Sequence, residues 1–159
     1  MNRIYLLLGS NLGNSKEQLL MAAQQLHQKI GPVIRESSLY QTAAWGYHDQ
    51  PDFVNQVLLL RTSLDAEACI SNILAIEKKM GRLRTTKNAP RIIDIDILYF
   101  NSDIIQLPHL QVPHPAIHQR RFVLIPLTEL AADFIHPKLN KTNARLLAEC
   151  SDELDVKKI

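Results

Sequence analysis

The chain has 159 residues, of which 46% are hydrophobic and 21% charged, which suits one domain spanning residues 1–159. A net charge of +2 gives no field strong enough to hold nucleic acid without specific contacts. Cys69 and Cys150 lie in neither a C-x-x-C nor a metal-ligand spacing, which predicts reduced thiols in a cytoplasmic protein. The N-terminal apolar run, Ile4 to Leu8, is too short for a signal peptide or a membrane span.

Hydrophobic periodicity and turn residues predict an alternation of strands and helices. Ser15 and Gln18 have the spacing of a capping box at the start of the first helix, and Ser63 or Asp65 can cap the second. The predicted elements, in chain order, are a strand at 4–8, a helix with an apolar stripe from Leu19 to Ile30, strands at 33–40 and 53–60, a helix with a stripe from Ala66 to Met80, a strand at 92–100 and a partner strand beginning at Ile104.

This β-α-β-β-α-β order predicts an α+β protein with a ferredoxin-like core, in which helices cover one face of a mainly antiparallel sheet. From His114 onward the chain is predicted to be mostly helical, a C-terminal elaboration of that core. The last residues, Asp152 to Ile159, are predicted to form a frayed end. The fold alone does not give a function, because this arrangement supports many activities.

The most informative segment is the strand at 92–100, which contains Asp94 and Asp96. Because side chains alternate along a strand, Ile93, Ile95, Ile97 and Tyr99 should share an apolar face and the two aspartates the other. Two carboxylates side by side are unfavourable unless a cation or hydrogen bonds meet them, and oxygen ligands of this kind suit Mg²⁺. An acidic, solvated outer face is the alternative, and for an isolated D-x-D it would be preferred.

A basic loop directly before the aspartates changes that preference. Its cations are Lys78, Lys79, Arg82, Arg84, Lys87 and Arg91. Metal ligands on a rigid strand, with guanidinium groups beside them to neutralise developing charge, are what phosphoryl transfer requires. No P-loop and no kinase-type glycine-rich loop is present, so the sequence indicates phosphate chemistry of another family.

The sequence resembles the 6-hydroxymethyl-7,8-dihydropterin pyrophosphokinases of folate biosynthesis. The most specific of the segments that carry the resemblance is Lys87-x-Ala89-Pro90-Arg91-x-x-Asp94-Ile95-Asp96-Ile97-Leu98. The others, in the order of the family, are Gly9-Ser10-Asn11-Leu12-Gly13, Gln50-Pro51-Asp52-Phe53-Val54-Asn55, Glu77 to Arg84, and Val112-Pro113-His114 with Arg120 and Phe122. The resemblance implies a monomer that transfers pyrophosphate from Mg–ATP: the pterin hydroxymethyl oxygen attacks the β-phosphorus and AMP leaves.

The resemblance also implies roles for individual residues. Four are catalytic, namely Arg82, Arg91, Asp94 and Asp96, and the two aspartates would bind two Mg²⁺ ions between the ATP phosphates. Residues that would bind ATP are Glu77, Arg84, Ile97, Leu98, Leu110, Val112, His114 and Arg120. Residues that would bind the pterin are Thr42, Ala43, Ala44, Trp45, Gly46, Phe53, Asn55 and Phe122, with the two phenylalanines stacking on its ring. For Trp45, a place covering the core is an equally supported interpretation.

Four other interpretations are weaker. Periodicity alone would make Phe53 and Phe122 ordinary core residues. His109, His114 and His118 suggest zinc, but no cysteine joins them. An RNA-binding module would need an RNP1-type aromatic sequence, which is absent, and the aspartates would repel phosphate. A regulatory domain without catalysis would need neither Mg²⁺ nor arginines placed to reach phosphate.

Overall fold

The computed structural model describes residues 1–43, 50–82 and 90–159 of the chain. Its elements are β1 (Asn2–Ser10), α1 (Ser15–Lys29), β2 (Val33–Glu36), β3 (Tyr40–Thr42), β4 (Phe53–Thr62), α2 (Ala66–Lys79), β5 (Asp94–Phe100), β6 (Ile105–Leu107), β7 (Leu110–Val112), the 3₁₀ turn η1 (Ile117–Gln119), α3 (Arg121–Ala131), α4 (Asn143–Glu149) and β8 (Val156–Lys158).

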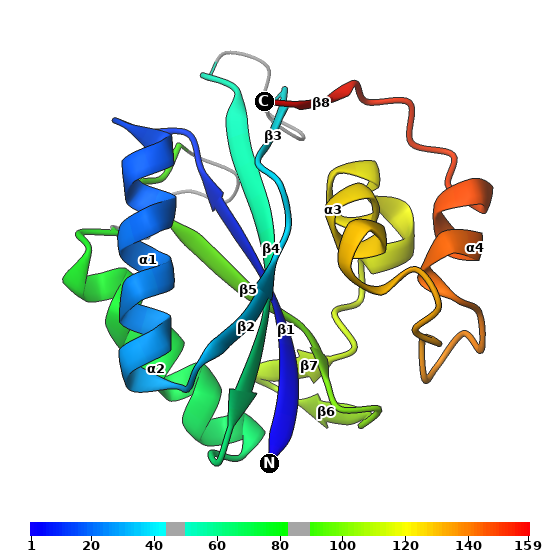
Figure 1. Ribbon diagram of the computed structural model, residues 1–159, viewed down its shortest axis with the longest axis horizontal. Helices are drawn as coiled ribbons and strands as arrows, with labels where there is room; N and C mark the ends of the chain where they lie inside the picture. The colour runs from blue at the N-terminus through cyan, green and yellow to red at the C-terminus, as the bar shows by residue number, and fades with distance from the viewer. Residues whose placement is uncertain (44–49, 83–89) are drawn as a thin grey trace.

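Within the described residues the main sheet has six strands in the order β5-β1-β4-β3-β8, and β2 also pairs with β4. Every pairing in it is antiparallel, and the long strands β1 and β4 lie at its centre. The antiparallel order of β5, β1, β4 and the strands beyond β4, together with α1 and α2 between them in the chain, confirms the predicted α+β, ferredoxin-like core. Figure 1 shows α1 and α2 together on one side of this sheet, and α3 and α4 on the other.

The helices α1 and α2 bury their apolar stripes against the first face of the sheet. The fully buried side chains there come from both partners, and include Leu6, Leu8, Leu26, Leu58 and Ile73. Asp65 caps α2 by accepting a hydrogen bond from the Ala68 amide at 2.8 Å. The predicted Ser15 cap of α1 is wrong by one residue, because Asn14 occupies that position and accepts from the Glu17 amide at 3.3 Å.

The second face of the sheet carries its own apolar cluster under α3 and α4. It includes Leu7, Val57, Leu124 and Leu127. Tyr99 also belongs to it, so its predicted place beside Ile93, Ile95 and Ile97 is wrong. The register of β5 on β1 shifts between Tyr5 and Leu6, where Leu98 is the extra residue, and the bulge turns Tyr99 to the other face. There the Tyr99 hydroxyl donates to Asn143 Oδ1 at 2.7 Å.

Three more predicted elements differ from the structure. The strand predicted at 33–40 is split into β2 and β3, because Ser37 turns to bond with Val57: the Ser37 amide donates to the Val57 carbonyl and its hydroxyl accepts from the Val57 amide, each at 2.9 Å. The strand after the turn at 101–103, β6, pairs with β7 and not with β5. The predicted frayed end is wrong, since β8 pairs with β3. None of the helices in the described ranges is long and apolar enough to cross a membrane.

Candidate active site

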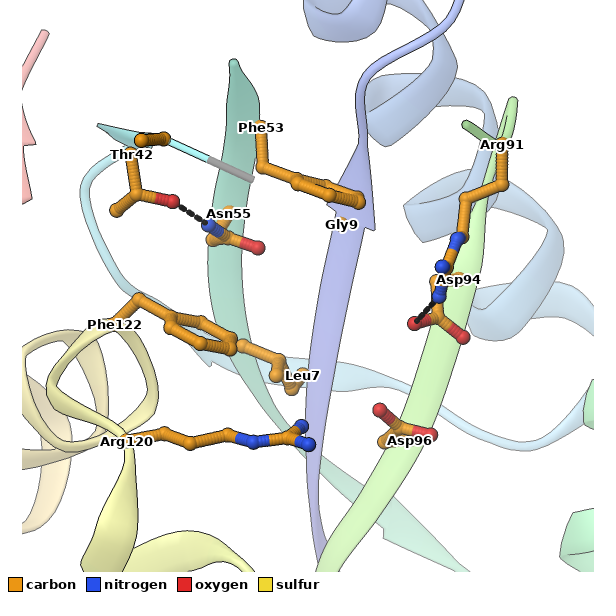
Figure 2. Close-up of a pocket in the computed structure, with 11 residues that line it drawn as sticks. Leu7, Gly9, Thr42, Phe53, Asn55, Arg91, Asp94, Asp96, Arg120 and Phe122 are labelled. Atoms are coloured by element: carbon orange, nitrogen blue, oxygen red, sulfur yellow. Dashed lines mark hydrogen bonds and ion pairs between the residues drawn. The ribbon is translucent and has the colours of Figure 1, made fainter. Parts of the chain in front are cut away.

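A pocket opens at one end of the second sheet face, beside the start of α3, and Figure 2 shows its side chains. The empty space in it is about 530 Å³, part of it open to solvent. The residues that line it are Leu7, Gly9, Thr42, Ala43, Phe53, Asn55, Arg91, Asp94, Asp96, Arg120 and Phe122. Nine of these eleven were predicted as site residues from the sequence, and they come from three strands and two segments beside them.

The acidic end of the pocket is built by β5. Asp94 and Asp96 both face the pocket, as strand alternation predicts, while Ile95 between them is buried in the opposite core. In the register of the sheet Asp94 lies opposite Gly9 and Asp96 opposite Leu7 on β1. Because β5 pairs along its length with β1, the two carboxylates are held on a rigid support.

Asp94 is held by two arginines. Arg82 Nη1 lies 2.7 Å from Asp94 Oδ1, and Arg91 Nη1 lies 3.1 Å from Asp94 Oδ2. Arg82 Nη1 also lies 2.6 Å from Glu77 Oε2, and Glu77 is only 2% exposed. Glu77 Oε2 in turn accepts the Ile95 amide at 2.8 Å, which fixes the strand between the two aspartates. Glu77 is therefore the buried support of this network of charges.

Asp96 has the opposite electrostatic environment. Burial raises the pKa of Asp96 to about 7, and the neighbouring carboxylates of Asp94 and Glu77 add to the rise, while Arg120 and Arg82 oppose it. His114 lies nearby; burial and the charge of Arg120 lower its pKa to about 4, with Asp94 opposing. His114 is held by its amide, which donates to the Leu98 carbonyl at 3.0 Å. Asp96 is thus a carboxylate whose ionised form would gain from a cation.

The other end of the pocket is lined by two aromatic rings and by neutral polar side chains. Figure 2 shows the Phe53 and Phe122 rings reaching into it from different elements, with Asn55 between them. The Asn55 amide donates to Thr42 Oγ1 at 3.2 Å, and both side chains are 3% exposed. The Arg91 guanidinium carbon lies 5.5 Å from the Phe53 ring centre, so the aromatic and acidic ends meet at that arginine.

Gly9 and Leu7 form the floor of the pocket and were not predicted as site residues. A Cβ placed on Gly9 would lie 2.9 Å from Asn55 Oδ1 and 3.6 Å from the Phe53 ring. The first distance is too short for a Cβ contact, so even an alanine there would displace the Asn55 amide, whereas the distance to Phe53 is an ordinary van der Waals contact. In the sequence, Gly9 was part of a segment that resembles the family, but no role in the site was predicted for it. That Gly9 lies opposite Asn55 depends on the pairing of two distant strands, which no local pattern reveals.

Asn11 was also missed. It is 2% exposed, and its Oδ1 accepts the Arg91 amide at 2.9 Å. Its Nδ2 donates to the Pro51 carbonyl at 3.1 Å and to the side chain of Gln50. Asn11 therefore joins the chain just before Phe53 to the chain that carries Arg91. The signal available in the sequence was its place in the glycine-rich turn, which also suits an ordinary turn asparagine.

Other predicted residues lie elsewhere or outside the described part of the chain. Ala44, Trp45, Gly46 and Arg84 belong to the latter group. Four of the residues predicted to bind ATP are buried in apolar clusters. Ile97, Leu110 and Val112 belong to the cluster under α1 and α2, and Leu98 belongs to the cluster on the second face. His114 lines a separate hollow together with His118 and His136.

The donor set bears on metal binding. Among residues 1–43, 50–82 and 90–159, no three His, Cys, Asp or Glu side chains gather as a complete protein cage for a metal. Two carboxylates on one strand face, one of them with a raised pKa, fit an ion that takes one or two protein ligands and fills its other positions with water and phosphate. Mg²⁺ has that preference, so the residues present fit it.

Comparisons with known proteins identify the family of the chain. Residues 5–132 match the family described as 7,8-dihydro-6-hydroxymethylpterin-pyrophosphokinase. The chain is 38% identical over 141 residues to the 2-amino-4-hydroxy-6-hydroxymethyldihydropteridine pyrophosphokinase of Aquifex aeolicus, covering 89% of this chain and 88% of that one. It is also 38% identical over 145 residues to the folic acid synthesis protein FOL1 of Dictyostelium discoideum, covering 91% of this chain but only 22% of the relative's length.

A solved structure shares the fold. The crystal structure of Plasmodium falciparum HPPK-DHPS with pteroate superposes with a TM-score of 0.76, at 19% identity, over 93% of this chain and 42% of that chain. Fold, pocket and sequence therefore define a domain of the α+β pyrophosphokinase class. The chain belongs to the 7,8-dihydro-6-hydroxymethylpterin-pyrophosphokinase family.

Proposed function

We propose that the chain transfers pyrophosphate from ATP to the hydroxymethyl group of 6-hydroxymethyl-7,8-dihydropterin, releasing AMP. The observation that carries the proposal is one pocket in which an aromatic, amide-edged end adjoins an acidic end bordered by arginines. Membership of the family supports it over an RNA-binding or non-catalytic domain. Folate synthesis is named for the Dictyostelium relative, and we extend it to this chain as part of the proposal.

The pterin would lie between Phe53 and Phe122, whose rings offer stacking surfaces for a flat heterocycle. Asn55 and Thr42 are buried and polar, so they can meet the donor and acceptor edge of the ring. A stacked, hydrogen-bonded ring would be fixed in one orientation. Its hydroxymethyl group would then point toward the aspartates, which turns the transfer into a reaction between positioned groups.

The phosphates would lie at the acidic end. Asp94 and Asp96 are the residues that would hold Mg²⁺, and a bound ion would supply charge neutralisation for the triphosphate. In the structure Arg82 and Arg91 contact Asp94 at 2.7 and 3.1 Å. We infer that they exchange that carboxylate for phosphate oxygens, since guanidinium groups bind both in the same forked geometry.

The transfer forms a bond between the hydroxymethyl oxygen and the β-phosphorus and breaks the bond to the oxygen that leaves with AMP. Negative charge develops on that leaving oxygen and is spread over the transferred group. Arg82, Arg91 and Arg120 lie at this end of the pocket. Once Arg82 and Arg91 have turned from Asp94 to the phosphates, the positive charge of the three arginines can stabilise the transition state. Glu77 would keep Arg82 in place throughout, because it is buried beside it.

The experiment is ³¹P NMR of the purified protein with ATP, Mg²⁺ and 6-hydroxymethyl-7,8-dihydropterin. We expect AMP and a pterin diphosphate to appear only when the pterin is present. An Asp96→Ala variant should lower the rate by at least about a hundredfold, since the lost carboxylate supports several kcal/mol of charge stabilisation. Asp103→Ala, at an exposed turn after the same strand, is the matched control and should leave the rate unchanged.

Two results would contradict the proposal. Formation of ADP in place of AMP would mean that the γ-phosphorus is attacked. Bound ATP without any turnover would indicate a nucleotide-binding domain that lacks this catalysis.

A further inference from the structure

The C-terminal segment, residues 152–159, contacts two of the elements that carry pocket side chains, α3 and β3. In Figure 1 it runs from α4 above α3 and finishes as β8 beside β3. The pocket residues Arg120 and Phe122 lie at the start of α3, and Thr42 lies at the end of β3. The C-terminal segment, which was predicted to fray, is thus attached at the start of α3 and at the end of β3, and both places carry residues of the pocket wall.

The first attachment is at the start of α3. Asp152 Oδ2 accepts the Arg121 amide at 3.0 Å, and Arg121 Nη1 donates to the Leu154 carbonyl at 3.2 Å. Asp152 Oδ1 also accepts the Leu154 amide at 3.0 Å, which keeps the carboxylate in place. Arg121 stands between Arg120 and Phe122, so these contacts fix the backbone from which both pocket side chains project.

Asp152 fills a role that the local sequence of α3 cannot. The first amides of a helix need acceptors, and the residue before the helix usually supplies one from a Ser, Thr, Asp or Asn side chain. In α3 that position is held by Arg120. Its guanidinium contains hydrogen-bond donors only, so it cannot accept from the helix amides, and it lines the pocket instead. Asp152, 31 residues away, provides the carboxylate, which also interacts favourably with the positive end of the helix dipole.

The second attachment is at the end of β3. Val156 pairs with Thr42 and Lys158 with Tyr40, and the Ile159 amide donates to the Leu39 carbonyl at 3.0 Å. Only three residues long, β3 pairs with β4 on its other side, where Thr42 lies opposite Phe53. The position of the Thr42 backbone determines where its hydroxyl accepts the hydrogen bond from Asn55. By pairing with β3, β8 therefore fixes the polar side of the pocket, although β8 itself does not line it.

We propose that residues 152–159 position the pocket wall for pterin binding, with Asp152 as the positioning residue for Arg120 and Phe122, and β8 as the support of Thr42 and Asn55. The inference deepens the proposed function and rests on it for its substrate. It predicts different effects from the two attachments, because Arg120 faces the phosphates while Thr42 serves the pterin alone.

The experiment compares three variants with the full chain by calorimetry. Asp152→Ala should weaken binding of both 6-hydroxymethyl-7,8-dihydropterin and a non-hydrolysable Mg–ATP analogue about fivefold, the effect of one helix cap. Asp152→Asn keeps an acceptor at the same place and should restore most of the affinity. Glu153→Ala, the exposed neighbour, is the matched control and should change neither value.

Removal of residues 156–159 tests the second attachment. It should weaken pterin binding severalfold and leave the affinity for the ATP analogue unchanged. Amide hydrogen exchange of residues 40–42, followed by NMR without ligand, should become faster in this variant but not in α1. Far-UV circular dichroism before each titration checks that the variants are folded.

The outcomes separate the alternatives. Lower melting temperatures with unchanged affinities and unchanged exchange at residues 40–42 would mean that the segment only stabilises the fold, which would overturn the inference. If the full chain binds no pterin, the proposed function fails, and the exchange measurement still decides whether the segment positions the wall.

Discussion

Individual residues divide the pocket into two chemical halves. Asp94 and Asp96 on β5 supply negative charge, while Asn55 and Thr42 on the neighbouring strands supply neutral hydrogen-bonding groups. Gly9 lies between the halves, opposite Asp94 on one side and Asn55 on the other. Because glycine has no side chain, the ring of Phe53 and the amide of Asn55 can approach β1. The pocket therefore keeps space for a flat ligand at this point.

This arrangement makes Gly9→Ala informative. The added Cβ would lie 2.9 Å from Asn55 Oδ1, so that amide must move by a few tenths of an ångström or more. We expect pterin affinity to fall about tenfold, the value of one displaced hydrogen bond to a buried group. Affinity for an ATP analogue should change little. Calorimetric titration of each ligand measures both values.

Ser10→Ala is the matched control, because Ser10 is the next residue of β1 and alternation turns it to the other face. If Gly9→Ala weakened both ligands equally, the whole strand would have moved, and the local explanation would be wrong.

At the scale of elements, α3 depends on contacts with β2 and β3. Glu129 near its end accepts hydrogen bonds from the Ser38 amide at 3.0 Å, the Ser38 hydroxyl at 3.1 Å and the Tyr40 hydroxyl. Arg35 Nη1 donates to the Leu130 carbonyl at 2.7 Å. The ionised carboxylate is favoured in this setting: the pKa of Glu129 is lowered by these hydrogen bonds although partial burial opposes them. The polar contacts fix how α3 lies across the sheet.

A double-mutant cycle can measure this attachment. Glu129→Gln and Tyr40→Phe should each destabilise the fold by about 1 kcal/mol, as expected for a hydrogen bond to a charged group that is partly exposed. Because the two residues share one bond, the double variant should be less destabilised than the sum of the two. Urea unfolding of the four proteins gives these free energies, and strict additivity would show that the pair does not interact.

The elements also show what the sequence can reveal. Strand alternation was sufficient to put Asp94 and Asp96 on one face, since that property is local to the strand. The same rule failed at Tyr99, because the bulge at Leu98 arises from pairing with β1. The end strand β8 was missed for a related reason: three residues with two lysines have little strand propensity, and their strand exists only because β3 offers an edge.

Roles in the site were predicted for residues to which the family resemblance assigns them, and were missed where the place of a residue in the pocket depends on contacts between distant strands. Phe53 and Phe122 look like ordinary core residues by periodicity, and only the resemblance assigned them to the pterin. Leu7, Gly9 and Asn11 received no role because their neighbours in the pocket come from β4 and β5, more than forty residues along the chain in the case of Asn55.

For the whole molecule, His136 makes stability depend on pH. It is 3% exposed, and its Nδ1 accepts the amides of Lys138 at 3.1 Å and Leu139 at 3.0 Å, so the folded state needs that nitrogen unprotonated. Burial lowers the pKa of His136 to about 4, and the nearby His118 and Lys138 add to the effect. Between pH 6.5 and 4 the unfolded chain therefore binds more protons than the folded chain, and stability falls as the pH falls.

We expect His136→Asn to reduce this dependence. The asparagine Oδ1 can take the place of Nδ1 as acceptor, and it does not titrate. Melting temperatures at pH 7 and pH 5 should differ less in the variant than in the unmodified chain, with the His114 imidazole accounting for part of the remaining difference. An equal fall in both proteins would show that His136 does not contribute.

The closing strand β8 has one more consequence, which concerns the behaviour of many copies of the chain together. It is the last strand of the sheet beyond β3, and it is short and carries Lys157 and Lys158. Short, lysine-bearing outer strands discourage the addition of a further strand from another molecule. A chain that ends before Val156 would leave the open hydrogen-bonding groups of β3 at the border of the sheet. We expect such protein to self-associate by strand addition at concentrations above those used for the binding titrations.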